Sequence, residues 1–319
     1  MDLFTNHFKK MKILVTGGAG FIGSHLCKAL LKKGHEVICF DNFSTGSNEK
    51  INDIKNQIEL IEGDCNTDDL KKAFQNNIDI VFHYAATVGV KRTQEKPMSV
   101  FDDIIGIRNI LELSYQNKVK KVIFASSSEI YGNPKEMPEK EDGIIDPIQP
   151  YAGVKLIGEQ LMETYHNKFN LNTCSLRFFN VYGSNQISNA YGFVTGKFIN
   201  QVLSGKNPTV YGDGSQSRTF TYIDDNINMS LIAMESESTN GQVINIGSDK
   251  EISILDLAKK IIKSCNSDLE PVFVERENYD IVDKRCPDTT RMKKLLNYET
   301  KFSLNQGLSK TIEWFKSNK

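Results

Sequence analysis

The chain has 319 residues, of which 39% are hydrophobic and 25% charged, with 39 Lys and Arg against 40 Asp and Glu. This length is enough to bury a large core, and the balanced charge argues against a nucleic-acid or anionic-membrane partner. No apolar run approaches the roughly 20 residues that a membrane-spanning helix needs, so we expect no membrane segment.

Residues 1–10 precede the first strand-like segment and lack the apolar stretch of a signal peptide, so we interpret them as an N-terminal extension. Strands are then expected at 12–18, 36–42, 58–64, 79–86, 121–128 and 172–180. Helical patterns lie between most of them, such as 24–34, which ends on Gly34. Apolar strands that alternate with helices predict an α/β fold with a Rossmann-type, doubly wound parallel sheet.

After about residue 180 the alternation loosens. Turn clusters occur at 183–192 and 211–217, and helical patterns return at 253–264 and 303–317. We therefore predict a nucleotide-binding domain at 11–180 and a smaller C-terminal α/β lobe at 181–319 that binds the substrate, with some segments returning to the first domain.

The segment "TGGAGFIG" (16–23) places Gly17, Gly20 and Gly23 between the first strand and the first helix. Such a turn lets backbone N–H groups and a helix N-terminus approach a pyrophosphate. Asp41, 18 residues after Gly23, ends the second strand, where a carboxylate binds both adenosine ribose hydroxyls and repels a 2′-phosphate. We therefore predict NAD as the cofactor. Asp64 ends the third strand and is either an adenine contact or a strand-end cap.

The segment "YAGVK" places Tyr151 and Lys155 on one face of a helix. A phenol with a pKa near 10 becomes a usable base when an ammonium and a positive nicotinamide ring favour the phenolate. We expect Tyr151 to take the proton of a sugar hydroxyl during hydride transfer. An amphipathic helix with surface Tyr and Lys is the alternative interpretation, and the serines of "ASSSEIYGN" upstream argue against it.

From Met11 to its end the chain resembles the extended short-chain dehydrogenase/reductases of the nucleotide-sugar epimerase/dehydratase group. The resemblance rests on "TGGAGFIGSHL", "DNFSTG", "HYAA", "SSSEIYG", "YAGVK", "LRFFNVYG", "TVYGDGSQSRTFTYIDD" and "CPDTTRMKKLLNY". It implies an enzyme that uses NAD and acts on a UDP-, GDP-, CDP- or dTDP-linked sugar. It also implies a homodimer that pairs through the helices near 99–117 and 151–168.

The resemblance assigns further residues by motif. Ser127 takes the place of the catalytic hydroxyl beside Tyr151, with Ser128 next to it, and Asn109 that of a cofactor-supporting asparagine. The other implied cofactor contacts are Phe21, Ile22, Asn42, Ser44, Thr45, Gly46, Cys65, Tyr84, Ala85 and Ala86. The implied substrate contacts are Ser127, Ser128, Asn180, Lys197, Thr209, Tyr211, Arg218, Tyr279 and Arg285, with Arg218 on the diphosphate and Thr209 and Tyr211 along the base.

Glu129 distinguishes three outcomes within this group. Simple 4-epimerases usually carry a small hydroxyl residue here, whereas dehydratases and decarboxylases carry Glu as a base for chemistry on a 4-keto sugar. Ser128 before Glu129, together with Tyr279 and Arg285, resembles the decarboxylases, but "NVYGSNQ" and "NAYGFVTGK" lack the arginine that decarboxylases place in that loop. We favour a 4-epimerase. A lyase that uses Glu129 and a dehydrogenase that releases the 4-keto sugar stay open, as does a carboxylate that only caps its turn.

The six cysteines are scattered, without CxxC or Cys/His spacing. Most lie in apolar surroundings, which is typical of reduced core thiols. We therefore predict a cytoplasmic protein without a metal site.

Overall fold

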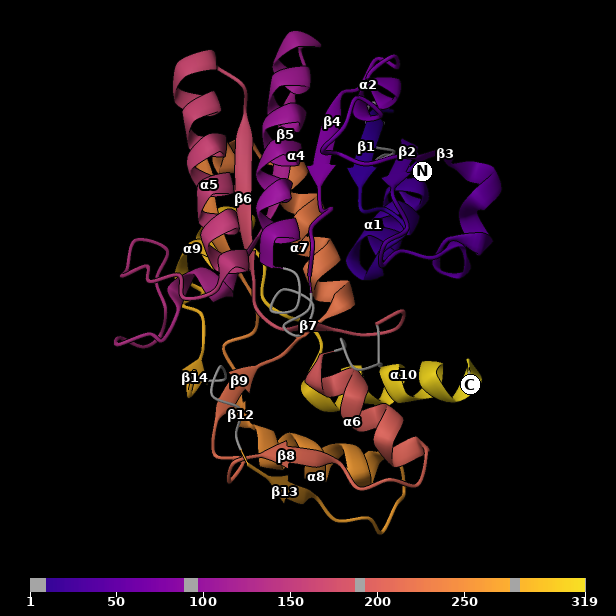
Figure 1. Cartoon of the computed structure of the whole chain (residues 1–319), viewed down its shortest axis with the longest axis vertical. Coiled ribbons are helices and arrows are strands. Elements are labelled where there is room, and N and C mark those ends of the chain that lie inside the picture. The colour runs from indigo at the N-terminus through magenta and orange to yellow at the C-terminus, as the bar shows by residue number, and fades with distance from the viewer. Residues whose placement is uncertain (1–9, 89–96, 187–192, 276–281, 319) are drawn as a thin grey trace, which may run out of the picture.

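The structure is a computed structural model that describes residues 10–88, 97–186, 193–275 and 282–318. Its centre is a seven-stranded sheet with the order β11-β6-β5-β4-β1-β2-β3, and every neighbouring pair is parallel (Figure 1). The strands are β1 (Lys12–Thr16), β2 (Glu36–Asp41), β3 (Glu59–Glu62), β4 (Ile80–His83), β5 (Lys121–Ser127), β6 (Thr173–Phe178) and β11 (Gln242–Ile246). The predicted Rossmann-type parallel sheet is thereby confirmed.

Strand β11 is the element of this sheet that the sequence analysis did not identify. It belongs to the second half of the chain and pairs with β6 from Gln242 opposite Cys174 to Ile246 opposite Phe178. Its sequence QVINI is too short and too mixed in polarity to stand out as a buried strand.

Helices cover both faces of the sheet (Figure 1). α2 (Leu70–Ala73), α4 (Pro97–Gln116) and α5 (Pro150–Phe169) pack on one face, and α1 (Phe21–Lys32) and α7 (Ile223–Glu235) on the other. Since successive strand residues point to opposite sides, Ile13 and Val15 join the core under α1 and α7, and Leu14 joins the core under α4 and α5.

Most of the other helices and strands form the lower part of the molecule in Figure 1, whereas α9 lies beside the sheet and contacts β11. They are β7 (Val181–Tyr182), α6 (Val194–Leu203), β8 (Thr209–Tyr211), β9 (Ser217–Thr219), β10 (Thr221–Tyr222), β12 (Glu251–Ser253), α8 (Ile254–Ser264), β13 (Val272–Val274), β14 (Lys284–Arg285), α9 (Thr290–Leu296) and α10 (Leu304–Ser317). They build small sheets of order β12-β9-β14, β13-β8 and β10-β7. The helices expected at 253–264 and 303–317 are present, and Ser253 and Ser303 cap their first turns.

The two parts of the chain share one core, in which Ile13 and Val15 of the first part lie with Ile223 and Leu308 of the second. Asp225 on α7 is fully buried, and its carboxylate accepts bonds from the Tyr298 hydroxyl (2.7 Å) and from the backbone N–H groups of Lys301 (2.9 Å) and Phe302 (3.1 Å). A buried carboxylate needs such partners, so this contact fixes the segment leading to α10 against the helix that covers the sheet. The predicted division of the chain into domains at 11–180 and 181–319 remains a proposal.

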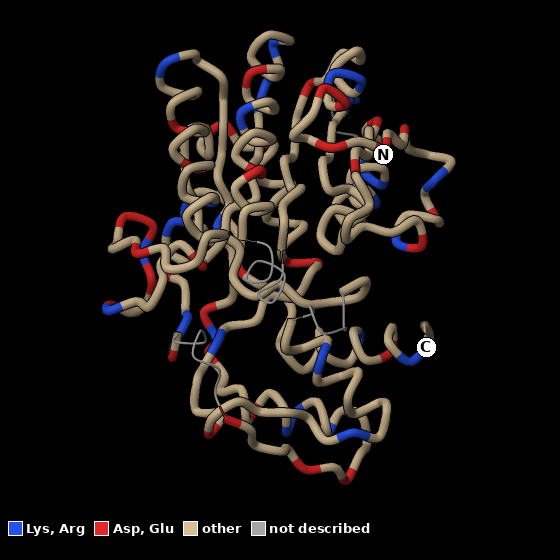
Figure 2. Tube along the Cα trace, viewed as in Figure 1, with Lys and Arg blue, Asp and Glu red and all other residues tan. Residues whose placement is uncertain are grey.

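Charge is mixed over the molecule: both signs occur in the upper and the lower part (Figure 2). Within the described ranges no helix is long and apolar enough to cross a membrane. All six cysteines are free, four of them buried and Cys265 and Cys286 partly buried.

Candidate active site

The glycine turn after β1 is closely packed. Gly17 has a φ of +69°, and a Cβ on it would lie 2.8 Å from the backbone nitrogen of Ala85. A Cβ on Gly23 would lie 2.0 Å from the Gly17 carbonyl oxygen. Only glycine fits these two positions, because a side chain would displace either the β4 end or the start of α1. The N-terminus of α1, with Phe21 and Ile22 partly buried, is thereby held open to an anion.

Asp41 ends β2 beside this turn and is buried. Its carboxylate accepts bonds from the backbone N–H groups of Ala19 (2.9 Å) and Phe43 (2.8 Å). Burial raises the pKa of Asp41 above its ordinary value, and these two backbone bonds lower it. A Cβ on Gly46 would lie 2.6 Å from Asp41 Oδ1, so the segment with Ser44 and Thr45 passes close over the carboxylate.

The third-strand residues form a hydrogen-bonded turn. Asp64 accepts a bond from the Asn42 side chain at 3.0 Å and from the backbone N–H of Asn66 at 2.8 Å. Asn109 on α4 donates to the carbonyl of Cys65 at 3.0 Å. Asn109 thus supports the turn that carries Asp64 and Cys65.

The end of β4 lies beside the glycine turn. The Ala85 N–H approaches Thr16 Oγ1 at 3.3 Å, next to Ala86. Tyr84 donates its hydroxyl to Ser230 on α7 at 2.8 Å. Any contact of Tyr84 with a cofactor would therefore use its backbone or ring, not its hydroxyl.

These groups test whether NAD fits. The glycine turn has no side chains in the path of a pyrophosphate, and Asp41 is a fixed carboxylate at the end of the neighbouring strand, where the ribose would lie. The residues present therefore fit NAD.

β5 ends in a 3₁₀ turn, η3 (Ser128–Tyr131), that carries the polar cluster. Ser127 caps it, and its hydroxyl accepts a bond from the Glu129 N–H at 3.2 Å. Ser127 also lies near enough to the Tyr151 phenol to lower its pKa. Ser128 is buried, whereas the Glu129 side chain is 47% exposed. The structure thus brings Ser127 and Tyr151 together, as the motif spacing predicts.

Tyr151 and Lys155 lie in the first turns of α5. The Lys155 ammonium is buried, donates to the Ala125 carbonyl at 2.7 Å and lies 5.5 Å from the centre of the Tyr151 ring. Burial lowers the pKa of Lys155 to about 8, while Asp103 and Glu159 raise it.

The effect that Lys155 and the nicotinamide ring are expected to have on Tyr151 stays a prediction. Burial raises the pKa of Tyr151 above its ordinary value, and the nearby Ser127 lowers it by less. The Lys155 ammonium lies 5.5 Å from the centre of the Tyr151 ring and bonds to the Ala125 carbonyl. In the protein alone the phenol therefore keeps its proton at neutral pH.

Asp103 on α4 is a neighbour of this pair that sequence reasoning missed. Its carboxylate accepts bonds from the backbone N–H (2.7 Å) and hydroxyl (3.2 Å) of Thr87, just after β4. It raises the pKa of both Tyr151 and Lys155. In the sequence, Asp103 stands out only because it lies on the same helix as Asn109. That position does not reveal that Asp103 lies near α5.

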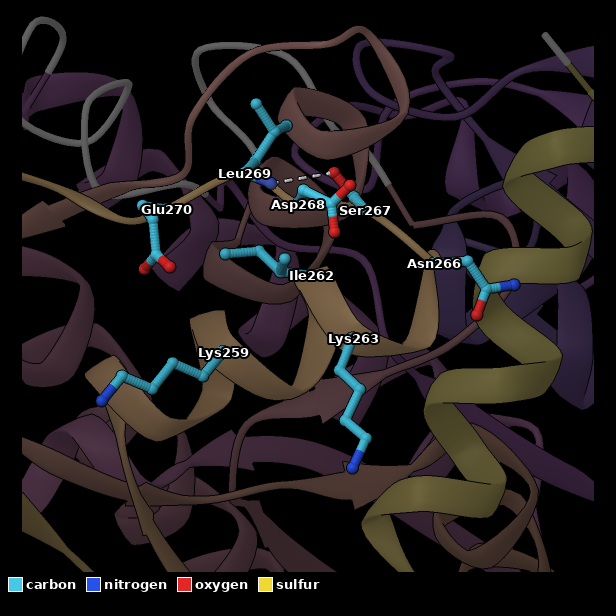
Figure 3. Close-up of a pocket in the computed structure, with 8 residues that line it drawn as sticks. All are labelled: Lys259, Ile262, Lys263, Asn266, Ser267, Asp268, Leu269 and Glu270. Atoms are coloured by element: carbon cyan, nitrogen blue, oxygen red, sulfur yellow. Dashed lines mark hydrogen bonds between the residues drawn. The ribbon is translucent and has the colours of Figure 1, made fainter.

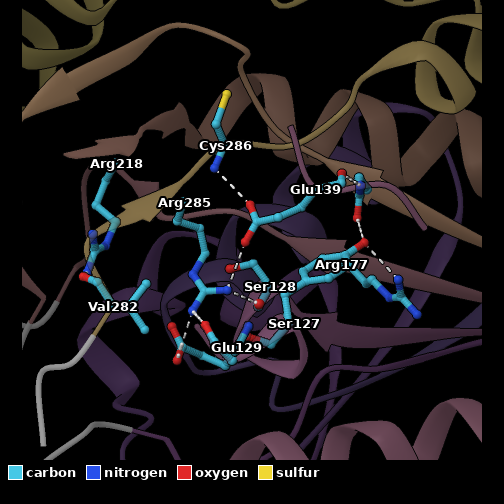
Figure 4. A network of polar contacts seen from close by, with 12 residues as sticks. Ser127, Ser128, Glu129, Glu139, Arg177, Arg218, Val282, Arg285 and Cys286 are labelled. Carbon is cyan, nitrogen blue, oxygen red and sulfur yellow. Dashed lines mark hydrogen bonds and ion pairs between the residues drawn. The ribbon is translucent and has the colours of Figure 1, made fainter. Parts of the chain in front are cut away.

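Two of the residues predicted to bind the substrate bond to backbone carbonyls of the protein. Asn180, at a φ of +38°, donates to the Thr219 carbonyl at 2.8 Å. Arg218 on β9 donates to the carbonyls of Ser217 and Val282, each at 2.8 Å (Figure 4). The Asn180 bond joins the segment after β6 to β9, and the Arg218 bond to Val282 joins β9 to the segment before β14. The substrate contacts of both residues remain predictions.

Thr209 and Tyr211 lie on β8 and Lys197 on α6, in the lower lobe and away from the glycine turn (Figure 1). Thr209 bonds through its hydroxyl and its N–H to the Gln201 amide. Tyr279 falls outside the described residues.

A surface depression of about 740 Å³ lies beside α8, lined by both basic and acidic side chains such as Lys263 and Asp268 (Figure 3). None of the predicted site residues lines it. It has no connection with the cluster around Tyr151.

Arg285 differs most from its predicted role. The resemblance implies a contact with the substrate, but its side chain is 1% exposed and bonds to the η3 turn and to Glu139. Glu139, another buried group that sequence reasoning missed, carries no motif signal because it lies in an irregular segment. Arg285 therefore acts on the site from behind the turn.

Known proteins resemble this chain over nearly its whole length. The model of the NAD dependent epimerase/dehydratase family matches residues 13–247. UDP-N-acetyl-alpha-D-glucosaminuronate decarboxylase of Bacillus cytotoxicus is 37% identical over 96% of this chain and 98% of the relative.

Two solved structures are also similar. UDP-glucose 4-epimerase of Thermotoga maritima, with UDP-glucose, has a TM-score of 0.91 and 34% identity over 97% of this chain and 99% of that one. UDP-glucuronic acid 4-epimerase of Bacillus cereus, with UDP-glucuronic acid and NAD, has a TM-score of 0.89 and 35% identity over 97% and 100%. With the family model matching most of its length, this chain belongs to the NAD-dependent epimerase/dehydratase family.

Proposed function

We propose that the protein is a nucleotide-sugar 4-epimerase that works through a 4-keto sugar. The observation that carries this proposal is the placement of Ser127 near the Tyr151 phenol, with Lys155 beside the phenol ring. This group accepts the proton of one sugar hydroxyl. A reaction that removes a hydride from C4 and returns it to the other face needs no further base.

Each side chain has a defined task in this proposal. Ser127 orients the sugar hydroxyl, and Tyr151 takes its proton and later returns it. Bound NAD supplies the hydride acceptor and, in its oxidised form, a positive charge. A positive charge beside the phenol would lower the pKa of Tyr151, against the effect of burial, and would so favour the phenolate. Lys155, fixed by Ala125, holds the phenol ring in position.

A decarboxylase is the second candidate. Two observations favour it: Glu129 extends from the catalytic turn with its side chain 47% exposed, and a relative at 37% identity is named as a decarboxylase. On a 4-keto uronic acid such a carboxylate would assist loss of CO₂ and protonation of the carbon left behind. Against it, the buried Arg285 already bonds to Glu139, so its charge is matched inside the protein.

We also propose that the protein forms a homodimer through α4 and α5. Apolar side chains lie exposed along these helices, among them Met98, Phe101, Ile105 and Ile157. Exposed apolar side chains gathered on two neighbouring helices are typical of an interface between subunits.

Replacing both Ile105 and Ile157 with Glu tests the dimer, since Ile105 is 50% exposed and Ile157 36%. Charges in an apolar helix interface should convert the dimer to a monomer, as measured by sedimentation equilibrium. Ile144→Glu, at a 60% exposed position outside these helices, is the control and should leave the mass unchanged. A wild-type protein that sediments as a monomer at micromolar concentration would contradict the proposal.

Asp41→Ala tests the cofactor contact. Without the carboxylate that repels a 2′-phosphate, the preference for NAD over NADP should fall to near one, as measured by titration of both nucleotides. Asp68→Ala, at an exposed carboxylate, should keep the wild-type preference. If Asp41→Ala discriminates as well as the wild type, Asp41 does not bind the ribose.

Tyr151→Phe removes the proton acceptor and keeps the ring. Turnover should fall about 10²–10⁴-fold while binding of the nucleotide sugar is retained, because general-base roles are worth that much. Tyr165→Phe, on the same helix, is the matched control and should keep nearly full activity. Near-normal turnover by Tyr151→Phe would show that another group takes the proton.

Incubation in D₂O with UDP-, GDP-, CDP- and dTDP-sugars separates the candidate reactions. We expect a product isomeric with its substrate and free of carbon-bound deuterium, and we expect Glu129→Gln to retain measurable activity. Deuterium in the product, lost in Glu129→Gln, would indicate a lyase. Stoichiometric NADH, followed by its absorbance, would indicate a dehydrogenase that releases the 4-keto sugar.

A further inference from the structure

Arg285 holds the catalytic turn at both ends. Its guanidinium donates to the carbonyl of Ser128 at 2.5 Å and to that of Gly132 at 2.9 Å (Figure 4). The same group lies 3.7 Å from the carboxylate of Glu129. Since Arg285 is on β14, this contact joins the small sheet of the lower lobe to the turn at the end of β5.

Glu139 is the closer counter-charge of this arginine. Its Oε1 lies 3.1 Å from Arg285 Nη1, and its Oε2 accepts the Cys286 N–H at 2.8 Å. The backbone of Glu139 also donates to the Cys286 carbonyl at 2.9 Å and accepts from the Asp288 N–H at 2.8 Å. Its side chain is 1% exposed, so the pair has a fixed geometry and little solvent screening.

Two carboxylates therefore share one guanidinium: Glu139 from the buried side and Glu129 from the exposed side. We propose that Glu139 is a positioning residue, which acts through Arg285 to keep Glu129 free to face the sugar. While Glu139 is ionised, its negative charge neutralises much of the positive charge of Arg285. When it is neutral or absent, Glu129 is drawn towards Arg285 and away from the substrate.

The environment of Glu139 brings this change into the neutral range. Burial raises the pKa of Glu139 to about 7, Arg285 and the Cys286 N–H lower it, and Glu129 raises it. Arg285, Glu129 and Cys286 are the titratable groups that face it among the described residues. Because burial raises the pKa of Glu139 to about 7, we expect its charge to change within the pH range of the kinetic test.

This inference rests on the proposed chemistry at C4 and adds to it a task for Glu129, which is to help hold the sugar in place for the transfer. Glu139→Gln imitates the neutral form and keeps the shape of the side chain. Glu141→Gln is the matched control: Glu141 is a buried carboxylate two residues away that lies 3.7 Å from Arg291 and does not contact Arg285. Steady-state kinetics of the NAD-loaded enzyme from pH 5.5 to 9 are compared for the wild type and both variants, with any nucleotide sugar that is turned over.

We expect the ratio of wild-type to Glu139→Gln kcat to be near one at the acidic end and to rise to about tenfold above pH 8, with KM changed much less; displacements of an ångström have effects of this size or larger. The ratio for Glu141→Gln should not vary with pH. In a Glu129→Gln background, Glu139→Gln should have no further effect, because the two changes act through one contact. Glu139→Asp, which keeps the charge but withdraws it from Arg285, should lower kcat and retain the pH step.

A Glu139→Gln ratio that is constant across this pH range, or equal effects of Glu139→Gln with and without Glu129, would overturn the proposal. If Glu139→Gln does not fold, Glu139→Asp with wild-type kcat overturns it as well. These ratios do not depend on whether the product is an isomer of the substrate. A non-isomeric product in D₂O would overturn the 4-epimerase alone.

Discussion

A buried ion pair between Arg177 on β6 and Glu159 on α5 underlies the candidate site. Two parallel bonds join them, Nε to Oε1 at 2.9 Å and Nη2 to Oε2 at 2.7 Å. Ser126, which precedes the η3 turn, donates to the same carboxylate. Since Glu159 is one helical turn after Lys155, this pair fixes the register of α5 against β5 and β6. Removing one partner would leave an unmatched buried charge, at a typical cost of about 3–5 kcal/mol.

The same arginine extends the network to the second half of the chain. Arg177 donates to the Tyr131 hydroxyl at 2.7 Å, and Tyr131 donates to Asn245 on β11 at 2.7 Å. Asn245 in turn donates to the Glu139 carbonyl at 2.8 Å. The η3 turn is therefore held by Arg177 from the sheet side and by Arg285 from the lower lobe. These contacts hold the turn through Tyr131 and through backbone carbonyls, and they thereby position the serine hydroxyls and Glu129.

Burial also sets the chemical state of the site. It raises the pKa of Tyr151 and lowers that of Lys155, so the protein by itself favours the neutral forms of both groups. His83, which bonds to Thr16, follows the same rule: burial lowers its pKa to about 3.

The local sequence determined those features that depend on neighbouring residues. The glycine turn, the Asp41 strand end and the Tyr151–Lys155 spacing are short motifs set between periodic strands and helices, so the Rossmann-type sheet and the NAD cofactor were predictable. The short strand β11 was not, because QVINI becomes a buried strand only when β6 lies beside it. Arg285 and Glu139 are 146 residues apart, and neither lies in a pattern that indicates the other. Whether a charged side chain faces a substrate or a buried partner depends on which distant segment excludes water from it, and only the tertiary structure decided that.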